Sequence, residues 1–249
     1  MIGLQLLFWC AGGLIFATHD IAWVRGEDGR RRADEAALTL ALADVQRSPA
    51  EAAQVAAPAL AAASEAEARA SVRSATLRMW RGVPVYEIRS AERVALVDAR
   101  SGALLSPIDE ATARALAQDD RVGAPAVLQA TRISDNPPLE YRSGALPAWQ
   151  VVLDDDDNTH IYIDAHSGRI TARRNDAWRR FDFFWMLHTM DYQGRDDFNH
   201  LLLIVASVVG LVAVLSGWYL WALRLTRRLR RRGRRGRGDS SLAAGDGVS

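Results

Sequence analysis

Three histidines that flank the apolar segments of this chain are the residues best suited to chemistry. His19 follows the first apolar run, His188 lies in an aromatic segment, and His200 opens the second apolar run. Two imidazoles from different helices can hold a b-type haem between them where the surroundings are apolar. His188 and His200 stand twelve residues apart with Gly194 between them, so a bent connection would bring the two rings together. The candidate cofactor ligands are therefore His188, His200 and His19.

The same histidines also have a plainer interpretation. An imidazole at a membrane border is amphipathic, and hydrogen bonds to Asp191 or to lipid headgroups would hold it there. A metal other than haem iron is a third alternative, because an imidazole pair is not specific for haem. The side chains available to wall a pocket are Trp23, Phe184, Trp185 and Met186. The residues alone leave haem, another metal and an interfacial role open.

Other residue patterns count against several kinds of chemistry. The sequence contains no G-x-S-x-G, no H-E-x-x-H, no phosphate-binding loop and no dinucleotide fingerprint. A redox role would therefore need another protein as its electron donor. The acidic run Asp154–Asp157 lacks the glycine and the downstream glutamate of a calcium loop, so we expect a solvated hairpin tip. Cys10 is the single cysteine, so no disulfide can form within the chain.

Two apolar segments must position the histidines. Residues 201–223 hold no charged residue, and as a helix they would extend ~34 Å, enough to cross a bilayer. The run Ile2–Thr18 is at the lower limit of a span. It has no Lys or Arg before Arg25, which favours an uncleaved membrane helix over a signal peptide. The start of the second helix is predicted to be capped by Asp197 or Asn199.

Charge predicts the orientation. All 31 basic residues are Arg, and residues 224–249 carry nine of them with two Asp, a net charge of +7 against −6 for the remainder. Arginines next to a span mark its cytoplasmic side. Both termini are therefore expected in the cytoplasm of a bacterium, with the central domain in the periplasm. We expect the tail to bind anionic lipids and not nucleic acid, because it is tethered and has no aromatic residue among its arginines.

Between the apolar segments, the same order of elements is predicted twice. A helix with Ser48 as N-cap and Pro49 in its first turn precedes strands at 75–80, 84–89 and 93–99. A helix at 109–118, capped by Asp109, precedes strands at 126–133, 147–153 and 159–165. The third strands end in VDARSGALL and IDAHSGRIT, which align with an offset of 66 residues. Each half is expected to be a helix on a three-stranded meander, with His166 exposed in the second turn.

These motifs resemble a known family. The V/I-D-A-x-S-G-x-L/I turn after a helix and hairpin resembles the PepSY domain, present twice. The stretches GLQLLFWCAGGLIFATHDIAWVRGE and AWRRFDFFWMLHTMDYQGRDDFNHLLLIVASVVGLVAVLSG resemble the two membrane segments of the PepSY-associated transmembrane family. Larger members are similar to iron-regulated membrane proteins and four-span ferric-siderophore reductases. This chain has two apolar segments and lacks the His-Arg pair that usually precedes the first. The resemblance implies membrane redox or iron handling and raises the expectation of haem.

The expected fold is α+β, with two transmembrane helices flanking a tandem PepSY-like domain. The predicted parts are a transmembrane helix at 1–18, a first repeat with an Ala-rich helical lead-in at 19–108, a second repeat at 109–176, an interfacial aromatic segment at 177–200, a second transmembrane helix at 201–223 and a basic disordered tail at 224–249.

Three functions remain open on the sequence. The first is an accessory in membrane redox or ferric-chelate handling that carries b-type haem at the periplasmic membrane face, an electron-transfer subunit more than a stand-alone enzyme. The second is a non-enzymatic periplasmic module, inhibitory or chaperone-like, that docks a partner through a sheet edge. The third is a structural accessory of a larger complex. Two helices give little room for a haem, so the first function implies a homodimer or a larger membrane redox complex.

Overall fold

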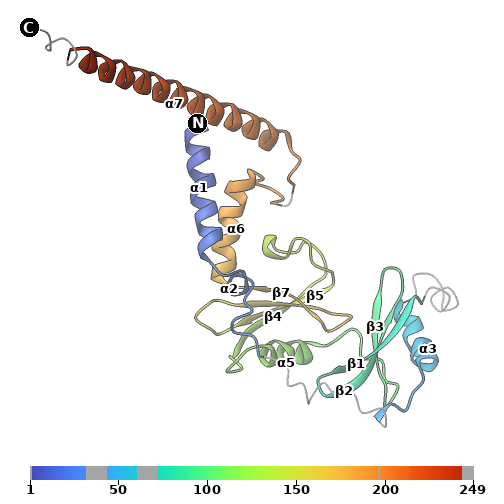
Figure 1. The fold of residues 1–249 in the computed structure, drawn as a ribbon. Helices are drawn as coiled ribbons and strands as arrows, with labels where there is room; N and C mark the ends of the chain where they lie inside the picture. The colour runs from blue at the N-terminus through green and yellow to red at the C-terminus, as the bar shows by residue number, and fades with distance from the viewer. Residues whose placement is uncertain (1, 32–43, 61–71, 196, 243–249) are drawn as a thin grey trace, which may run out of the picture. The chain divides into compact units, whose positions relative to one another are not determined.

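The computed structural model describes residues 2–31, 44–60, 72–195 and 197–242 (Figure 1). The chain divides into two compact units. The sheet unit is His19–Phe181, and the helix unit combines Met1–Thr18 with Asp182–Ser249. Each unit has its own set of contacts, and each is described separately below.

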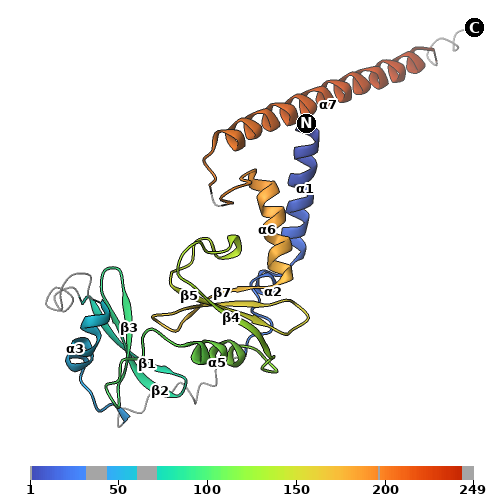
Figure 2. The ribbon, with the colours of Figure 1, turned by 180° about the vertical axis from the view of Figure 1, so that it is seen from behind.

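The first half of the sheet unit is a helix on a three-stranded antiparallel sheet. β1 (Ser74–Trp80), β2 (Val83–Arg89) and β3 (Val94–Asp98) pair in the order β1-β2-β3, and α3 (Pro49–Leu60) covers one face (Figures 1 and 2). Alternate side chains of the strands point toward α3, as the two-residue period of a half-buried strand requires. The resulting core contains Ala52, Ala56, Ala57, Leu60, Tyr86, Ile88, Ala95, Val97 and Ala99.

The second half repeats the layer arrangement with one more strand. β4 (Val127–Ile133), β5 (Ala148–Leu153), β6 (His160–Asp164) and β7 (Ile170–Arg174) pair in the order β4-β5-β6-β7, and α5 (Glu110–Asp120) packs on one face. Its core contains Ile108, Ala113, Ala117, Val151, Leu153, Ile161 and Ile163. The loop after β4, with the short 3-10 helix η3 (Leu139–Tyr141), supplies Tyr141, whose ring stacks on Tyr162 with centroids 4.3 Å apart.

The starts of α3 and α5 are as predicted. Ser48 Oγ accepts the backbone N–H of Glu51 at 3.2 Å, and Glu51 Oε2 accepts the backbone N–H of Ser48 at 2.7 Å. This reciprocal capping box satisfies two donors that the first turn of α3 leaves open. Asp109 Oδ1 accepts the backbone N–H of Thr112 at 2.8 Å and begins α5 in the same way. The other predicted helical residues of the Ala-rich lead-in, 32–43 and 61–71, lie outside the described part of the chain.

The prediction of a three-stranded meander in the second half was wrong, because β7 follows the Asp164–Arg169 turn. The sequence ITARR ends in two arginines, and only Ala172 in it is buried, so its apolar alternation is weak. At the corresponding place in the first half, the chain makes only an isolated bridge between Val97 and Leu104.

The Asp164–Arg169 turn contacts the first sheet and is not an exposed tip. Ala165 O accepts the backbone N–H of Ile108 at 2.8 Å, and the carbonyl of His166 accepts the hydroxyl of Ser106. His166 is therefore half-buried, which corrects its predicted exposure. Gly168 adopts φ +59°, and a Cβ at this position would lie 2.8 Å from the Trp80 ring. Only glycine fits this close, left-handed turn without strain.

The helix unit contains α1 (Ile2–Thr18), the second part of α6 (Asp176–Thr189) and α7 (Leu201–Leu242). Within the described residues, Leu201–Arg228 of α7 is the one segment long and apolar enough to cross a membrane; α1 is a shorter apolar helix. The apolar side chains of α7 are exposed along its length, among them Val212, Trp218 and Trp221. A helix that is apolar all round needs an apolar medium.

Two predictions about α7 were wrong. The helix continues past Leu223 to Leu242, so residues 224–242 are helical and not disordered. Arg and Leu are good helix formers, and no proline interrupts this stretch. The cap is also different, because His200 occupies the N-cap position that was predicted for Asp197 or Asn199.

Candidate functional site

The end of α6 is held by polar side chains of α1. Gln5 Nε2 donates to Leu187 O at 3.0 Å, and Trp9 Nε1 donates to His188 O at 2.8 Å. The last carbonyls of a helix have no hydrogen-bond partner within the helix, and an apolar medium offers none. The two bonds from α1 therefore satisfy the carbonyls of Leu187 and His188. They also fix the depth of His188 along α1.

Aromatic rings surround the imidazole of His188. The ring centroids of Trp9 and Phe16 lie 6.3 Å and 5.8 Å away, and Trp185 stacks at 6.4 Å with an interplanar angle of 11°. Gly12 faces the same ring, where a Cβ would come 3.7 Å from His188 Nδ1. The glycine leaves room for the imidazole between the two helices.

Neither ring nitrogen of His188 makes a hydrogen bond with a described residue, and Nδ1 is buried. Buried polar atoms without a partner are rare in folded proteins, because desolvation is not compensated. An imidazole in this state keeps a nitrogen lone pair for a ligand outside the chain. This is the strongest sign of a binding function in the helix unit.

The imidazole lines an open pocket of about 470 Å³. This volume is in the range of small-molecule and cofactor sites. Its walls are mainly aromatic and aliphatic side chains from α1, α6, the following loop and α7: Trp9, Trp185, His188, Thr189, Phe198, Leu203 and Ser207.

His200 lies close to this pocket but is engaged at both nitrogens. Its Nε2 is 2.9 Å from the carbonyl of Thr189, and its Nδ1 accepts the backbone N–H of Leu203 at 3.2 Å. The first contact uses Nε2 as a donor and the second uses Nδ1 as an acceptor, so both ring nitrogens are occupied. His200 joins the end of α6 to the start of α7.

The loop between α6 and α7 is fixed by carboxylates. Asp182 pairs with Arg195, and both side chains are largely buried. The carboxylate of Asp191 accepts backbone N–H groups from Gln193, Gly194 and Asp197 at 3.0–3.2 Å. The predicted bend around Gly194 is thus present, and it places His200 beside the residue that follows His188.

His19 belongs to the sheet unit. Its ring stacks on Trp23 with centroids 5.4 Å apart, directly before α2 (Ile21–Val24), which Asp20 caps. The structure therefore brings together His188 and His200 but assigns His19 to a separate environment. Trp23, predicted as a possible pocket wall, packs against His19 and under the guanidinium of Arg180.

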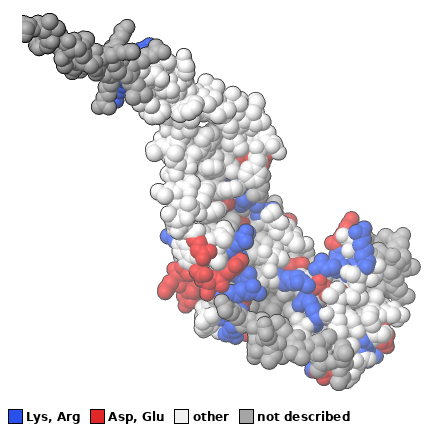
Figure 3. Space-filling model, viewed as in Figure 1, with Lys and Arg blue, Asp and Glu red and all other residues white. Residues whose placement is uncertain are grey.

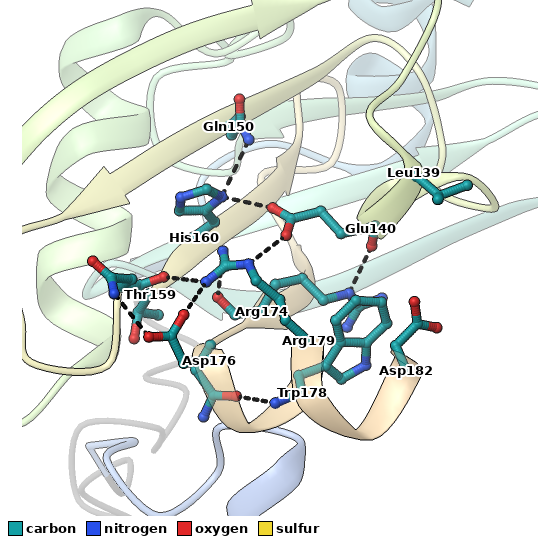
Figure 4. Close-up of polar contacts among 12 residues, drawn as sticks. Leu139, Glu140, Gln150, Thr159, His160, Arg174, Asp176, Trp178, Arg179 and Asp182 are labelled. Atoms are coloured by element: carbon teal, nitrogen blue, oxygen red, sulfur yellow. Dashed lines mark hydrogen bonds and ion pairs between the residues drawn. The ribbon is translucent and has the colours of Figure 1, made fainter. Parts of the chain in front are cut away.

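A second polar cluster, around Glu140, was not predicted (Figure 4). Glu140 Oε1 lies 2.6 Å from His160 Nδ1 and accepts the Tyr162 hydroxyl at 2.6 Å, while Oε2 accepts Arg179 Nε at 2.9 Å. Gln150 Nε2 donates to the Tyr162 hydroxyl at 2.7 Å. The cluster links η3, two strands and the first turns of α6.

The cluster has strong electrostatic effects. Burial alone would raise the pKa of Glu140, but hydrogen bonds from His160, Arg179 and Tyr162 outweigh it and lower that pKa to about 2. Burial and the adjacent Glu140 carboxylate raise the pKa of Tyr162. Glu140 is therefore a charged anchor for α6 and not a proton donor. The members of the cluster come from four separate places in the sequence (η3, β5, β6 and α6), so no spacing pattern predicts them.

The acidic run Asp154–Asp157 forms a turn between β5 and β6. Asp154, Asp156 and Asp157 are exposed, and Asp155 Oδ1 accepts the backbone N–H of Thr159 at 2.9 Å. No group of three or more His, Cys, Asp or Glu suited to a metal occurs among the described residues.

Comparison with known proteins decides the family. A family model described as "PepSY-associated TM region" matches residues 1–242, nearly the whole chain. The chain belongs to this family. No curated protein and no solved structure matched. The family assignment confirms the resemblance inferred from the sequence and makes this a membrane protein of the PepSY-associated class.

In this PepSY-associated protein, Trp185 lines the pocket as predicted, whereas Phe184 and Met186, also predicted as walls, are not among the residues that line it. The parts played by Gln5, Trp9 and Gly12 were missed. A lone Gln in the apolar α1 was the available signal, because a polar side chain in such a helix needs a partner. Trp9 and Gly12 gave no signal, since both are ordinary residues of membrane helices.

Proposed function

We propose that this PepSY-associated protein is an electron-transfer accessory of a membrane redox or iron-handling system, and that it carries a b-type haem on His188. The observation that carries the proposal is the imidazole of His188, which lies in an aromatic pocket with neither ring nitrogen bonded to a described residue. Apolar walls and one available imidazole are what a haem site requires of a protein.

The residues present fit a haem in part. His188 would hold the haem through its imidazole, and Trp9, Trp185 and Phe198 would line its site. A bound haem supplies a one-electron couple at the iron, which the side chains of this chain do not have. The chain itself holds the imidazole in place, through the Trp9 bond to its backbone, and excludes water with aromatic side chains.

A second ligand for the haem would come from a second copy or another subunit. His200 could bind it only by giving up its bond to Thr189, which joins α6 to α7, or its bond to Leu203, which caps α7. A symmetric homodimer would supply two copies of His188. It would also cover part of the exposed apolar surface of α7.

The proposed topology has two spans. α1 and α7 cross the inner membrane, the tandem PepSY-like sheet unit lies in the periplasm, and both termini are cytoplasmic. Support comes from the apolar length of α7, from the shorter apolar helix α1, and from the arginines that follow Leu223. The match of the two halves in helix caps, strand order and glycine turns supports their origin as a tandem repeat.

A difference spectrum tests the haem. The protein purified in detergent from haem-replete cells should show a b-type band on reduction, with haem quantified as the pyridine complex. His188→Ala should lose the band. His200→Asn should keep it, because Asn is also a good N-cap residue and preserves the start of α7. Absence of a band from the folded wild-type protein, or its survival in His188→Ala, would refute the proposal.

A second function is favoured by the edge of the second sheet. β4 is an edge strand whose residues are mostly exposed, including Leu128 at 63%. Such an edge can add a strand from a partner. A periplasmic binding module, inhibitory or chaperone-like, is therefore the alternative if no haem binds. The test is cross-linking of a partner protein to Leu128→Cys in the Cys10→Ser background. Cross-linking at this position, but not at Glu92→Cys in the same background, would support the alternative.

A further inference from the structure

Three arginines share one buried carboxylate where the two sheets meet. Glu87 on β2 has a side chain that is 2% exposed. Its Oε2 accepts Arg78 Nε and Arg169 Nε, both at 2.9 Å, and its Oε1 accepts Arg89 Nε at 2.8 Å. Arg78 and Arg89 come from the first sheet, whereas Arg169 comes from the Asp164–Arg169 turn of the second. We call these four residues the Glu87 cluster.

The Glu87 cluster holds two more positive charges than negative ones. A structural joint between the sheets would need only one arginine on the carboxylate, for example Arg169. The additional guanidiniums repel one another at short range, which works against the fold. Burial, together with the charges of Arg169 and Arg89, lowers the pKa of Arg78 even though Glu87 opposes this. The charge excess therefore needs another explanation.

The donors of the cluster are not used up by protein groups. Each guanidinium has five N–H groups in a planar fork. Arg78 Nη2 donates to Ser167 O at 2.8 Å, and all the other side-chain bonds of the three arginines to described residues go to Glu87. The side chains of Arg89 and Arg169 are 46% and 50% exposed. Their outer N–H groups face solvent while their inner ones are fixed by Glu87.

From these observations we infer that the Glu87 cluster binds an oxyanion, the carboxylate or phosphate group of a small molecule, between Arg89 and Arg169. Two guanidinium forks anchored on one carboxylate are already ordered, so little side-chain entropy is lost when an anion binds. Figure 3 shows basic surface between the two sheets on this face, separate from the acidic patch of the sheet unit.

The geometry also selects the kind of ligand. Arg89 and Arg169 converge on a single point, the Glu87 carboxylate, and do not form the extended basic stripe that nucleic acid needs. Gly168 brings the turn within contact of Trp80, so an apolar ring packs against the residue that precedes Arg169. A small molecule with one anionic head and an apolar part suits this surface.

Calorimetric titration of the full chain in detergent tests the inference. Inorganic phosphate and succinate, each titrated at low ionic strength, distinguish the two oxyanion classes, and sodium chloride serves as the simple-anion control. We expect saturable binding of at least one. Arg89→Gln and Arg169→Gln should each weaken it about tenfold, the effect of losing one charge-assisted bidentate contact.

Arg132→Gln is the matched control, because it removes the same charge from an exposed position on β4. It should leave the affinity unchanged. Arg169→Lys should weaken binding although it keeps the charge, since lysine has no planar fork. This variant keeps the test decisive should Arg169→Gln fail to fold. The inference would be overturned if neither anion bound saturably, or if Arg132→Gln weakened binding as much as Arg89→Gln and Arg169→Gln do. Neither result depends on haem.

Discussion

At the scale of single residues, the two charged clusters of the sheet unit differ in balance. Glu140 accepts one arginine, one tyrosine and one histidine, whereas Glu87 accepts three arginines. Burial alone would raise the pKa of Glu87. Hydrogen bonds from Arg169 and Arg89 outweigh burial and lower that pKa, so Glu87 also stays ionised. A carboxylate held this firmly stabilises the fold only while it is charged.

Glu140→Gln should therefore change the acid sensitivity of the protein. The folded pKa of Glu140 is about 2 against 4.5 for an ordinary glutamate. Its contribution, at most about 3 kcal/mol, is complete above pH 4.5 and is lost as the pH falls toward 2. Urea unfolding across this interval should show a shallower loss of stability with acid in the variant. Glu110→Gln is the control, because Glu110 forms only an exposed ion pair with Arg114. It should leave the dependence of stability on pH unchanged. Equal slopes in all three proteins would contradict the assignment.

At the scale of elements, the sequence predicted most helices and strands because their signals are local. The capping box at Ser48 and the Asp109 cap lie within one turn of each helix start, and β3 and β6 are short runs with three consecutive buried residues. β7 has no such run, and its sequence ends in two arginines. The pocket around His188 was predicted in part: Trp185 lies three residues before His188 in the sequence, but the α1 contacts join positions 179 and 182 residues apart.

The Asp164–Arg169 turn carries the element-scale prediction. Gly168→Ala should destabilise the protein by about 2–5 kcal/mol, because it combines a left-handed residue with a Cβ that overlaps Trp80. Gly123→Ala is the control, since Gly123 also has positive φ but a Cβ there would meet nothing within 4 Å. Gly123→Ala should lower the free energy of unfolding by only about 1–2 kcal/mol, the cost of a left-handed backbone conformation alone. Thermal unfolding of the two variants measures the difference. If both lost the same stability, the contact with Trp80 would be unimportant.

At the scale of the whole molecule, the distribution of apolar surface and arginine predicts topology. We expect Glu92→Cys, in the turn between β2 and β3, to react with a membrane-impermeant maleimide in cells whose outer membrane is permeabilised. Thr226→Cys, among the arginines at the C-terminal end of the Leu201–Arg228 segment, should react only after the inner membrane is opened. Both variants use the Cys10→Ser background, which leaves no other thiol. Labelling of Thr226→Cys in intact spheroplasts would reverse the proposed orientation.

The two halves of the sheet unit keep separate apolar cores, one under α3 and one under α5. Much of what joins the halves is polar: the Glu87 cluster, the Ser106 hydroxyl and a backbone bond to Ala165. Separate cores imply separate cooperativity, because each half loses its own hydrophobic free energy when it melts. Salt weakens the ionic part of the joint far more than either core. Ionic strength therefore sets whether the halves melt together or in sequence, and a half-folded intermediate is inherent in this architecture.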